Sequence, residues 1–293
     1  MLKKQLVLLH KERYGYMFVA PALLFFALFY LYPILDAIKT SLYSYTVYSS
    51  GWAGLGNYWH LLEDEVFRKS VQNTLLIALM LVPAKLLLSL TLSIIISQFK
   101  SKGQSFFKAV FYIPAVTSVV SITLMWQYIL NYDYGLLNYV IGLFGMDKVN
   151  VLSYDMALIT TTAIVLTMGV GQPIVILTAA LGGIPPSYYE AAEIDGASLF
   201  RKHASITLPM LKPAILFVVV TATIGAFQVF AIILLFTAGG PHYATSTILL
   251  LLYQEAFVNG DYGRGSAMAV ILSIIIVAIA WIQFKLLKTE IEY

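Results

Sequence analysis

Long apolar runs alternate with short polar segments along the whole chain. A bilayer core is crossed by about 20 consecutive apolar residues in a helix. The runs that reach this length cover residues 16–36, 71–97, 109–130, 157–182, 210–236 and 265–287. Hydrocarbon offers the backbone no hydrogen-bond partners, so each run is expected to be helical, and none shows the period-two alternation of a barrel strand. The pattern predicts an all-α integral membrane protein with six spans, its transmembrane domain covering residues 16–290 after an N-terminal segment 1–15.

The composition supports the membrane class. The 293 residues are 60% hydrophobic and 11% charged, whereas soluble domains are nearer half apolar and a quarter charged. The mean hydropathy is +0.83. Cysteine is absent, which excludes a disulfide framework and a thiolate metal site.

The basic residues predict the orientation, because Lys and Arg concentrate in the cytoplasmic segments of membrane proteins. One side of the predicted membrane carries Lys3, Lys4, Lys11, Arg13, Lys100, Lys102, Lys108, Arg201, Lys202, Lys212, Lys285 and Lys288. The other side carries Lys39, Arg68, Lys69, Lys148 and Arg264, and Lys85 lies inside the second span. This bias places both termini in the cytoplasm. We therefore expect a multi-pass protein of the plasma (inner) membrane.

One cytoplasmic segment, "YYEAAEIDGASLFRKHASITLPMLKP", stands apart from the apolar runs. Ser187 and Glu190 have the spacing of a capping box, which predicts the start of a short helix. Gly196 suits the left-handed residue that ends such a helix. A second short helix is expected over residues 198–205. Pro209 and Pro213 should then interrupt the helix before the fifth span begins.

Two interpretations of this segment compete. Most short loop helices are simply solvated, and the acidic Glu193 and Asp195 fit that interpretation. However, Ala191 and Ala192 give the helix a bare face that a partner backbone can approach closely. A solvated helix has no need of paired alanines next to a defined start and stop.

The segment resembles the EAA loop of ABC importer permeases, whose pattern is EAA, then Asp-Gly-Ala, then Ile-Thr-Leu-Pro. The matching residues here are Glu190-Ala191-Ala192, Asp195-Gly196-Ala197 and Ile206-Thr207-Leu208-Pro209. The resemblance implies that residues 186–207 form two coupling helices that dock into a cleft on a cytoplasmic ATPase subunit. It implies coupling roles for these motif residues and for Tyr189. His203 departs from the pattern, since the family usually has an aromatic residue there that packs in the ATPase cleft.

Further stretches resemble the MalF-like carbohydrate permeases. They are "FYIPAVTSVVSITLMWQYILNYDYGLLN" (Phe111–Asn138), "FTAGGP" (Phe236–Pro241) and the N-terminal "APALLFFALFYLYPI". The resemblance implies the MalF/LacF/UgpA-like subunit of an ABC importer, forming half of a pathway for a di- or oligosaccharide. The implied partners are a MalG-like second permease, two ATPase subunits, an extracellular solute-binding protein and membrane lipid, but no nucleic acid. ATP and Mg would be bound by the ATPase subunits, with no cofactor in this chain.

Lys85 is the one charged residue deep inside a predicted span, since Asp36, Lys212 and Lys285 lie within two residues of a span end. A charged group in the membrane is costly and usually faces a protein interior or a cavity. Two interpretations remain equally open: Lys85 packs in the bundle or snorkels, or it lines the substrate pathway.

Three glutamines, Gln127, Gln172 and Gln228, lie at span depth. Buried amides must find hydrogen bonds, and sugar pathways use such groups together with aromatic faces. Gly169 loosens the helix beside Gln172, and Phe227 precedes Gln228. In MalF-like permeases these two helices line the transport cavity. The alternative is that the glutamines are interhelical hydrogen-bonding groups, which is the commoner role of a single Gln in a membrane.

Two other function classes fit less well. A secondary carrier driven by an ion gradient usually shows internal repeats and intramembrane acids, and neither is evident here. A membrane enzyme would need catalytic parts, but there is no cysteine, HExxH, GxSxG or phosphate-binding loop. Co-purification of a soluble ATPase would separate an importer subunit from both alternatives.

The charge bias generates the first testable prediction, that both termini are cytoplasmic. A reporter that is active only in the cytoplasm should be active when fused after Tyr293. The same reporter inserted into the segment 131–155 should be silent. Activity of a periplasm-dependent reporter at Tyr293 would contradict the orientation.

Overall fold

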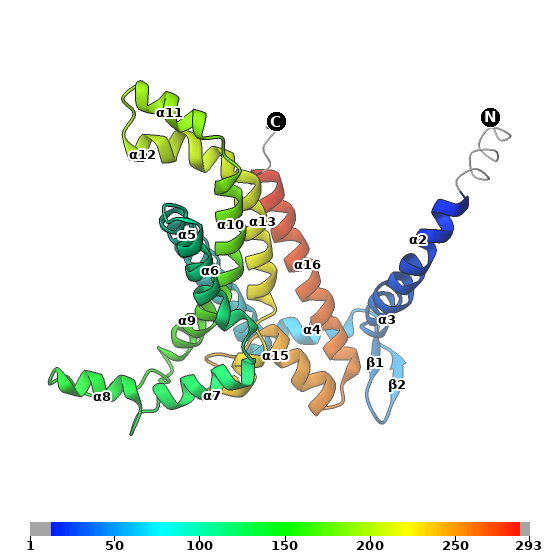
Figure 1. The fold of residues 1–293 in the computed structure, drawn as a ribbon. Coiled ribbons are helices and arrows are strands. Elements are labelled where there is room, and N and C mark those ends of the chain that lie inside the picture. Colours follow the sequence, from blue (N-terminus) through cyan, green and yellow to red (C-terminus); the bar gives the residue numbers. More distant parts are fainter. Residues whose placement is uncertain (1–12, 288–293) are drawn as a thin grey trace. The chain divides into compact units, whose positions relative to one another are not determined.

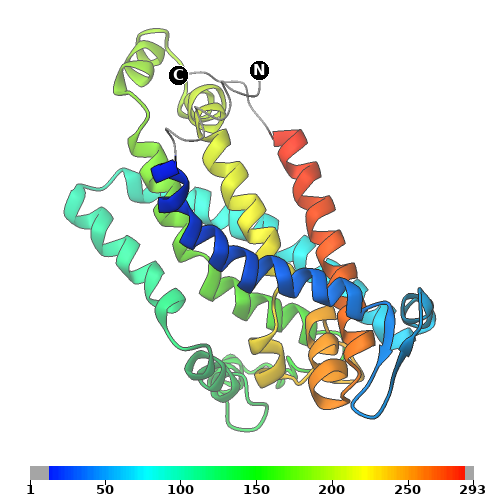
Figure 2. The same ribbon diagram turned by 90° about the vertical axis from the view of Figure 1, so that its right-hand side faces the viewer.

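The structure, a computed structural model, describes residues 13–287 and is almost entirely helical (Figures 1 and 2). The chain forms two compact units. The first contains the chain up to Leu61 together with Leu252–Val270, and the second contains Leu62–Leu251 together with the chain from Ile271. Most of the predicted N-terminal segment 1–15 lies outside the described residues.

The first unit is built from a long helix, a small hairpin and parts of two C-terminal helices. The long helix consists of α2 (Arg13–Phe26), the π-helical turn η1 (Ala27–Leu31) and α3 (Tyr32–Thr40). The hairpin pairs β1 (Tyr43–Tyr45) antiparallel with β2 (Ser50–Trp52). The remaining elements are α4 (Gly56–Glu63), the π-helical turn η3 (Gln254–Val258) and the first part of α16 (Tyr262–Leu287).

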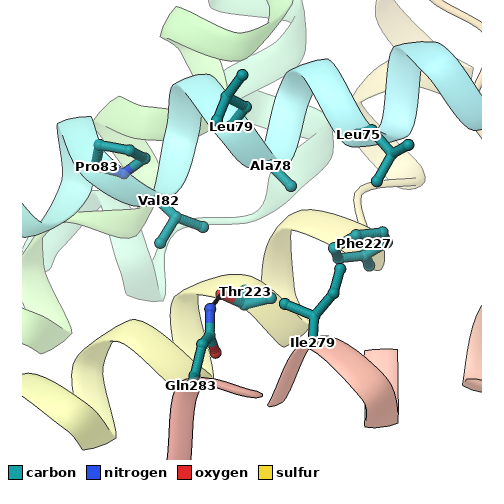
Figure 3. Close-up of a pocket in the computed structure, with 9 residues that line it drawn as sticks. All are labelled: Leu75, Ala78, Leu79, Val82, Pro83, Thr223, Phe227, Ile279 and Gln283. Atoms are coloured by element: carbon teal, nitrogen blue, oxygen red, sulfur yellow. Dashed lines mark hydrogen bonds between the residues drawn. The ribbon is translucent and has the colours of Figure 1, made fainter. Parts of the chain in front are cut away.

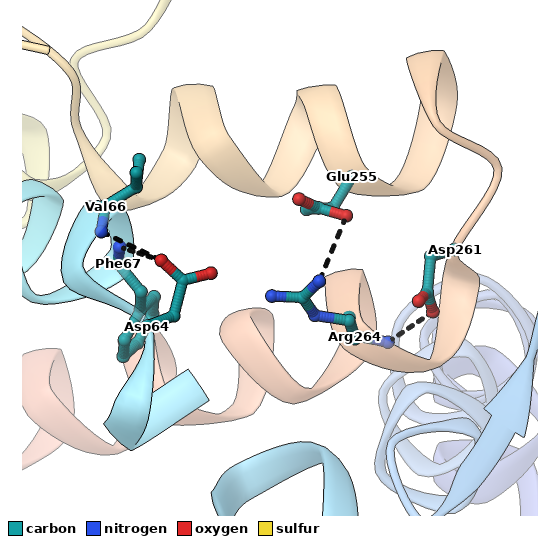
Figure 4. Close-up of polar contacts among 6 residues, drawn as sticks. All are labelled: Asp64, Val66, Phe67, Glu255, Asp261 and Arg264. Carbon is teal, nitrogen blue, oxygen red and sulfur yellow. Dashed lines mark hydrogen bonds and ion pairs between the residues drawn. The ribbon is translucent and has the colours of Figure 1, made fainter. Parts of the chain in front are cut away.

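Polar side chains fasten the segments of the first unit. The Asn57 amide donates to two backbone carbonyls around the start of β1, each at 2.8 Å. Arg264 forms an ion pair with Glu255 across 4.0 Å (Figure 4). The backbone N–H of Arg264 donates to Asp261 Oδ1 at 2.9 Å, which satisfies one of the free donors at the start of α16.

The second unit is a bundle arranged around α5 (Glu65–Ser97), which contacts α9, α10 and α13. Asp64 caps α5 by accepting the N–H groups of Val66 and Phe67 at 2.8 and 3.2 Å (Figure 4). The other elements are α6 (Ser101–Val116), α7 (Val119–Ile129), α8 (Leu136–Leu143), α9 (Ala157–Gly169), α10 (Gly171–Gly182), α11 (Pro186–Ile194), α12 (Leu199–Lys202), the π-helical turn η2 (His203–Thr207), α13 (Leu208–Phe227), α14 (Ala231–Phe236), most of α15 (Ile248–Tyr253) and the rest of α16.

The described residues contain six span candidates when each of two bent helix pairs counts as one span. The candidates without a sharp bend are Gly15–Ser41, Glu65–Ser97, Leu199–Phe236 and Tyr262–Leu287. The bent pairs are α6 with α7 and α9 with α10, at the third and fourth predicted spans. The all-α, six-span membrane fold is therefore confirmed.

The third predicted span, 109–130, was expected to be one continuous helix, and this expectation was wrong. α6 and α7 meet at 94°, with Thr117 and Ser118 between them in non-helical backbone. The Thr117 hydroxyl donates to the carbonyl of Ile113 at 2.8 Å. Such local bonds offer the backbone an alternative to the helical ladder. Apolar run length carries no signal for a break of this kind.

The prediction that Pro209 and Pro213 separate the second short helix from the fifth span was also wrong. The helix continues without a break from Leu199 to Phe227 through both prolines, as α12, η2 and α13. The π-helical turn η2 precedes them, and the N–H of Leu208 donates to the carbonyl of His203. Pro209 then falls in the first turn of α13, where the missing N–H of a proline costs little.

Buried hydrogen bonds in the second unit join α5 to the segment between α14 and α15. The Asn73 amide donates to the carbonyls of Tyr243 and Ser246 at 2.8 and 2.9 Å. The hydroxyls of Ser70 and Ser246 lie 2.9 Å apart. Thr74 accepts the N–H of Ile248 at 3.1 Å. These buried bonds fix the irregular segment after α14 against the regular helix α5.

Substitution of Asn73 by alanine should destabilise the protein. The change leaves the carbonyls of Tyr243 and Ser246 without this donor, at about 1–3 kcal/mol for each buried group left unsatisfied. Asn259→Ala, at an exposed position, is the matched control. Thermal unfolding of the detergent-purified protein measures both, and equal midpoints for the two variants would contradict the anchoring role of Asn73.

Candidate functional site

The segment that resembles the EAA loop forms a projection from the bundle. Figures 1 and 2 show α11 and α12 extending beyond the adjoining ends of α10 and α13. We refer to residues 186–207 as the α11–α12 projection. It contains two short helical pieces separated by Gly196, as the sequence predicts.

Gly196 ends α11 in a left-handed conformation with φ +71°. Its N–H donates to the carbonyl of Glu193 at 3.0 Å, and the N–H of Ala197 donates to the carbonyl of Ala192 at 2.9 Å. This is the double hydrogen-bond pattern of a Schellman motif, which favours glycine at the left-handed position. The predicted role of Gly196 as the stop of the first helix is confirmed.

The predicted capping box of Ser187 and Glu190 was wrong. The helix begins one residue earlier, with Pro185 as its N-cap and Pro186 as its first residue. Proline suits the first helical position, because its fixed φ is helical and its missing N–H would have had no partner there. Ser187 therefore lies inside the first turn, and the N-cap makes no side-chain hydrogen bond. The second helix starts as predicted, with Ser198 accepting the N–H of Arg201 at 3.4 Å.

Two residues with predicted coupling roles face the inside of the projection. The hydroxyl of Tyr189 lies 2.9 Å from Thr207 Oγ1, and His203 Nδ1 lies 3.1 Å from the same oxygen. Together with residues of α5, α6 and α10 they line a cavity of about 290 Å³. Tyr189 and His203 therefore join the first helix of the projection to its last residue, Thr207, and the imidazole is directed toward that residue.

The outer surface of the projection exposes apolar side chains that sequence analysis missed. Ile194 is 88% exposed, Leu199 74% and Phe200 83%. They flank Gly196, the residue at which the chain reverses. The available signal was the presence of large apolar residues inside the most polar segment of the second half of the chain.

The remaining motif residues differ in exposure. Glu190, Ala191 and Asp195 are exposed, as is Leu208, whereas Ala192, Ala197 and Pro209 are partly buried. Glu193 forms an ion pair with Lys202 across 3.3 Å, which links α11 to α12. The Glu193 side chain is 78% exposed, so solvent screens this pair and it contributes little to stability. The Gly196 turn and the Thr207 contacts therefore determine the shape of the projection.

The three glutamines occupy two kinds of environment. Gln127 donates to the carbonyl of Leu235 at 2.8 Å and so joins α7 to the α14 region, which favours its role in packing. Gln172, at the start of α10, and Gln228, directly after α13, are both exposed. Within the described chain no hydrogen bond is made by either amide. Amides at this depth are costly against lipid, so their faces require a polar cavity or another protein chain.

Phe227 is buried, unlike the exposed Gln228 that follows it. Its side chain is 1% exposed and forms a wall of a cavity of about 290 Å³ between α5, α13 and α16 (Figure 3). The amide of Gln283 donates to Thr223 Oγ1 at 2.7 Å on the edge of this cavity. The other lining residues are Leu75, Ala78, Leu79, Val82, Pro83 and Ile279. This cavity is mainly apolar, and Gln228 does not line it.

The fourth span bends where the sequence loosens it. α9 and α10 meet at 46° around Val170, between Gly169 and Gly171. A methyl group on Gly171 would collide with the carbonyl of Phe111, so α10 and α6 approach closely there. A methyl group on Gly169 would lie 3.0 Å from Lys85 Nζ. The bend therefore brings Lys85, Gly169 and the exposed Gln172 into one region of the second unit.

Comparison with known proteins identifies the family. Residues 69–289 match the family described as "Binding-protein-dependent transport system inner membrane component". The chain is 31% identical over 277 residues to the multiple sugar-binding transport system permease protein MsmF of Streptococcus mutans serotype c, covering 94% of this chain and 95% of the relative. It is 31% identical over 280 residues to the trehalose/maltose transport system permease protein MalF of Thermococcus litoralis, covering 94% of each chain.

A solved structure shares the fold. It is the crystal structure of a bacterial alginate ABC transporter in complex with an alginate pentasaccharide-bound periplasmic protein. One of its chains superposes with a TM-score of 0.82 at 22% identity, covering 97% of this chain and 98% of that chain. This chain therefore shares its overall fold with a chain of that solved structure. This chain belongs to the family of inner membrane components of binding-protein-dependent transport systems, and is a multi-pass ABC transporter permease.

Proposed function

We propose that this chain is the MalF-like permease subunit of an ATP-driven importer for a di- or oligosaccharide. The observation that carries the proposal is the α11–α12 projection, with the exposed apolar residues Ile194, Leu199 and Phe200 at its turn. Exposed apolar clusters on a soluble-facing surface mark interaction sites. The names of the sugar permease relatives MsmF and MalF support the substrate class.

The proposed partners follow from the same resemblance. They are a MalG-like second permease, two ATPase subunits and an extracellular solute-binding protein, with the spans in lipid and both termini in the cytoplasm. ATP and Mg would be bound by the ATPase subunits, and this chain would supply no catalytic group. A secondary carrier is the alternative. It has no use for a rigid apolar projection at the end of a span.

The proposed mechanism is alternating access. A solute-binding protein delivers sugar to the outer side, and ATP closes the ATPase pair against each other. The α11–α12 projection moves with the ATPase and carries α13 with it, because the helix from Leu199 to Phe227 is continuous. The face that bears Gln172 and Gln228 then opens outward. Hydrolysis returns it inward. The amides would replace the water that hydrogen-bonds to sugar hydroxyls in solution.

Replacement of Phe200 by serine should weaken retention of the ATPase subunits. Burial of a Phe side chain contributes about 1.5–3 kcal/mol, so the loss corresponds to about 10- to 100-fold in affinity. Pull-down of the ATPase from detergent-solubilised membranes measures this. Phe257→Ser removes a similarly exposed ring outside the projection and should retain the ATPase. Gly196→Val, which forces a β-branched residue to φ +71°, should act in the same direction as Phe200→Ser.

Normal ATPase retention in both Phe200→Ser and Gly196→Val, with normal sugar uptake, would show that the projection is only a loop. Membrane levels of each variant, measured by immunoblot, serve as the control for insertion. Both residues precede the predicted fifth span at 210–236, so these levels should be unchanged.

The variants Gln172→Leu and Gln228→Leu should lower sugar uptake while ATPase retention stays normal. Each substitution removes an exposed amide at span depth and keeps a side chain of similar size. Each lost hydrogen bond to sugar should cost about 0.5–1.5 kcal/mol. Gln127→Leu serves as a contrast, because its amide is already bonded to Leu235. Wild-type uptake by both test variants would assign Gln172 and Gln228 to contact with another subunit.

A further inference from the structure

The ammonium of Lys85 lies deep in the membrane region of the second unit. α5 has 33 residues, and at 1.5 Å per residue Lys85 is about 30 Å from its start and about 18 Å from its end. Both distances exceed half of a hydrocarbon core of about 30 Å. A charge at this depth is retained where it has a function or a partner.

A groove in the neighbouring span receives the side chain. At Gly169, a Cβ atom would lie 3.0 Å from Lys85 Nζ and 3.1 Å from Cε. Any other residue at position 169 would therefore displace the ammonium. Glycine at this position leaves the ammonium against the backbone of α9, at the last residue of that helix.

The bend between α9 and α10 gives this place a negative potential. Pro173 has no N–H, so the carbonyl of Gly169 cannot accept the usual hydrogen bond from four residues later. The last turn of α9 also carries the negative end of the helix dipole. The potential favours a cation, but it leaves the net positive charge of Lys85 uncompensated.

Lys85 has no counter-ion within the part of the chain that the structure describes. None of the ion pairs or hydrogen bonds among residues 13–287 includes its ammonium. The acidic residues of the second unit lie outside the interior of the spans, the nearest along α5 being Glu65 in its first turn. A half-buried ammonium without a carboxylate partner among the described residues is stabilised by pairing with an external anion.

Gln172 places a second polar group at the same bend. It is three residues beyond Gly169, is exposed, and has no hydrogen-bond partner among the described residues. An ammonium and an amide are the pair of groups that a sugar acid requires, the first for the carboxylate and the second for a hydroxyl. A single ammonium matches the unit charge of a carboxylate better than the nearly double charge of a phosphate monoester.

We propose that Lys85 is a specificity-determining residue that binds a carboxylate of the substrate, so that the transported saccharide is acidic, of the uronate class. This inference rests on the proposed function as a saccharide importer. Lys85 would form a charge-assisted hydrogen bond to the carboxylate while Gln172 orients the ring. The Gly169 groove would hold the ammonium when the site is empty.

The test uses the complete transporter, purified in nanodiscs with its partner permease and ATPase subunits. Tryptophan fluorescence titration measures the binding of trigalacturonate and of the same trisaccharide with its carboxyls reduced to alcohols. Wild type should bind the acid about 10- to 100-fold more tightly than the reduced sugar, since hydrogen bonds to charged groups contribute about 1.5–3 kcal/mol. Lys85→Met should abolish this preference and keep the affinity for the reduced sugar. Lys85→Arg should keep the preference.

Lys102→Met is the matched control, because it removes an exposed charge in the first turn of α6 and should leave the preference intact. Equal affinity of wild type for the two sugars would overturn the proposal, and ATP-driven uptake of a neutral sugar in proteoliposomes would then leave the proposed function standing. Loss of the partner permease from Lys85→Met would assign the ammonium to a contact between subunits and would likewise overturn it. Absence of ATP-driven uptake of any sugar by wild type would refute the proposed function itself.

Discussion

A peptide group in hydrocarbon must find its hydrogen-bond partner within the protein, and the rest of this structure follows from that constraint. It makes every long apolar run helical, so departures from the helix are confined to places where other groups can satisfy the backbone. Thr117 supplies a hydroxyl at the break between α6 and α7. The π-helical turn η2 rearranges the bonding ahead of Pro209. At Val170 the loosened backbone lies against Lys85 and Gly171 packs on α6.

These departures coincide with the residues to which we assign function. The bend at Val170 brings Lys85 and Gln172 to one region, and Gln228 follows the end of α13. The π-helical turn η2 contains His203 and Thr207, whose contact lies inside the projection and helps to determine its shape. A regular helix presents side chains at fixed spacing around its axis. A broken helix can direct a backbone carbonyl or an amide into a space that the regular one would close, and transport requires such polar groups inside an apolar layer.

The sequence predicted the features that depend on composition and on local backbone chemistry. The length of each apolar run located the spans, because the thickness of the hydrocarbon layer determines that length. Gly196 ended α11 as expected, because the left-handed conformation at a helix end is a requirement of the local backbone. The features that depend on tertiary contacts were not predictable. The 94° bend has no signal in an apolar count. The expected cap at Ser187 was wrong because Pro186, one residue earlier, also favours a helix start, and the helix begins there. Phe200 was missed because its importance lies in its 83% exposure, which only the folded projection reveals.

The helix that runs from Leu199 to Phe227 through α12, η2 and α13 is unbroken. It extends about 44 Å at 1.5 Å per residue, from the turn of the projection to the residue before Gln228. A flexible loop at Pro209 would absorb a displacement of Phe200, whereas a continuous helix transmits it. A tilt of about 5° over this length moves one end relative to the other by about 4 Å, which is comparable to the width of a sugar ring. A small rotation at the cytoplasmic end is thus sufficient, on geometry alone, to open or close a passage near the far end of the same helix.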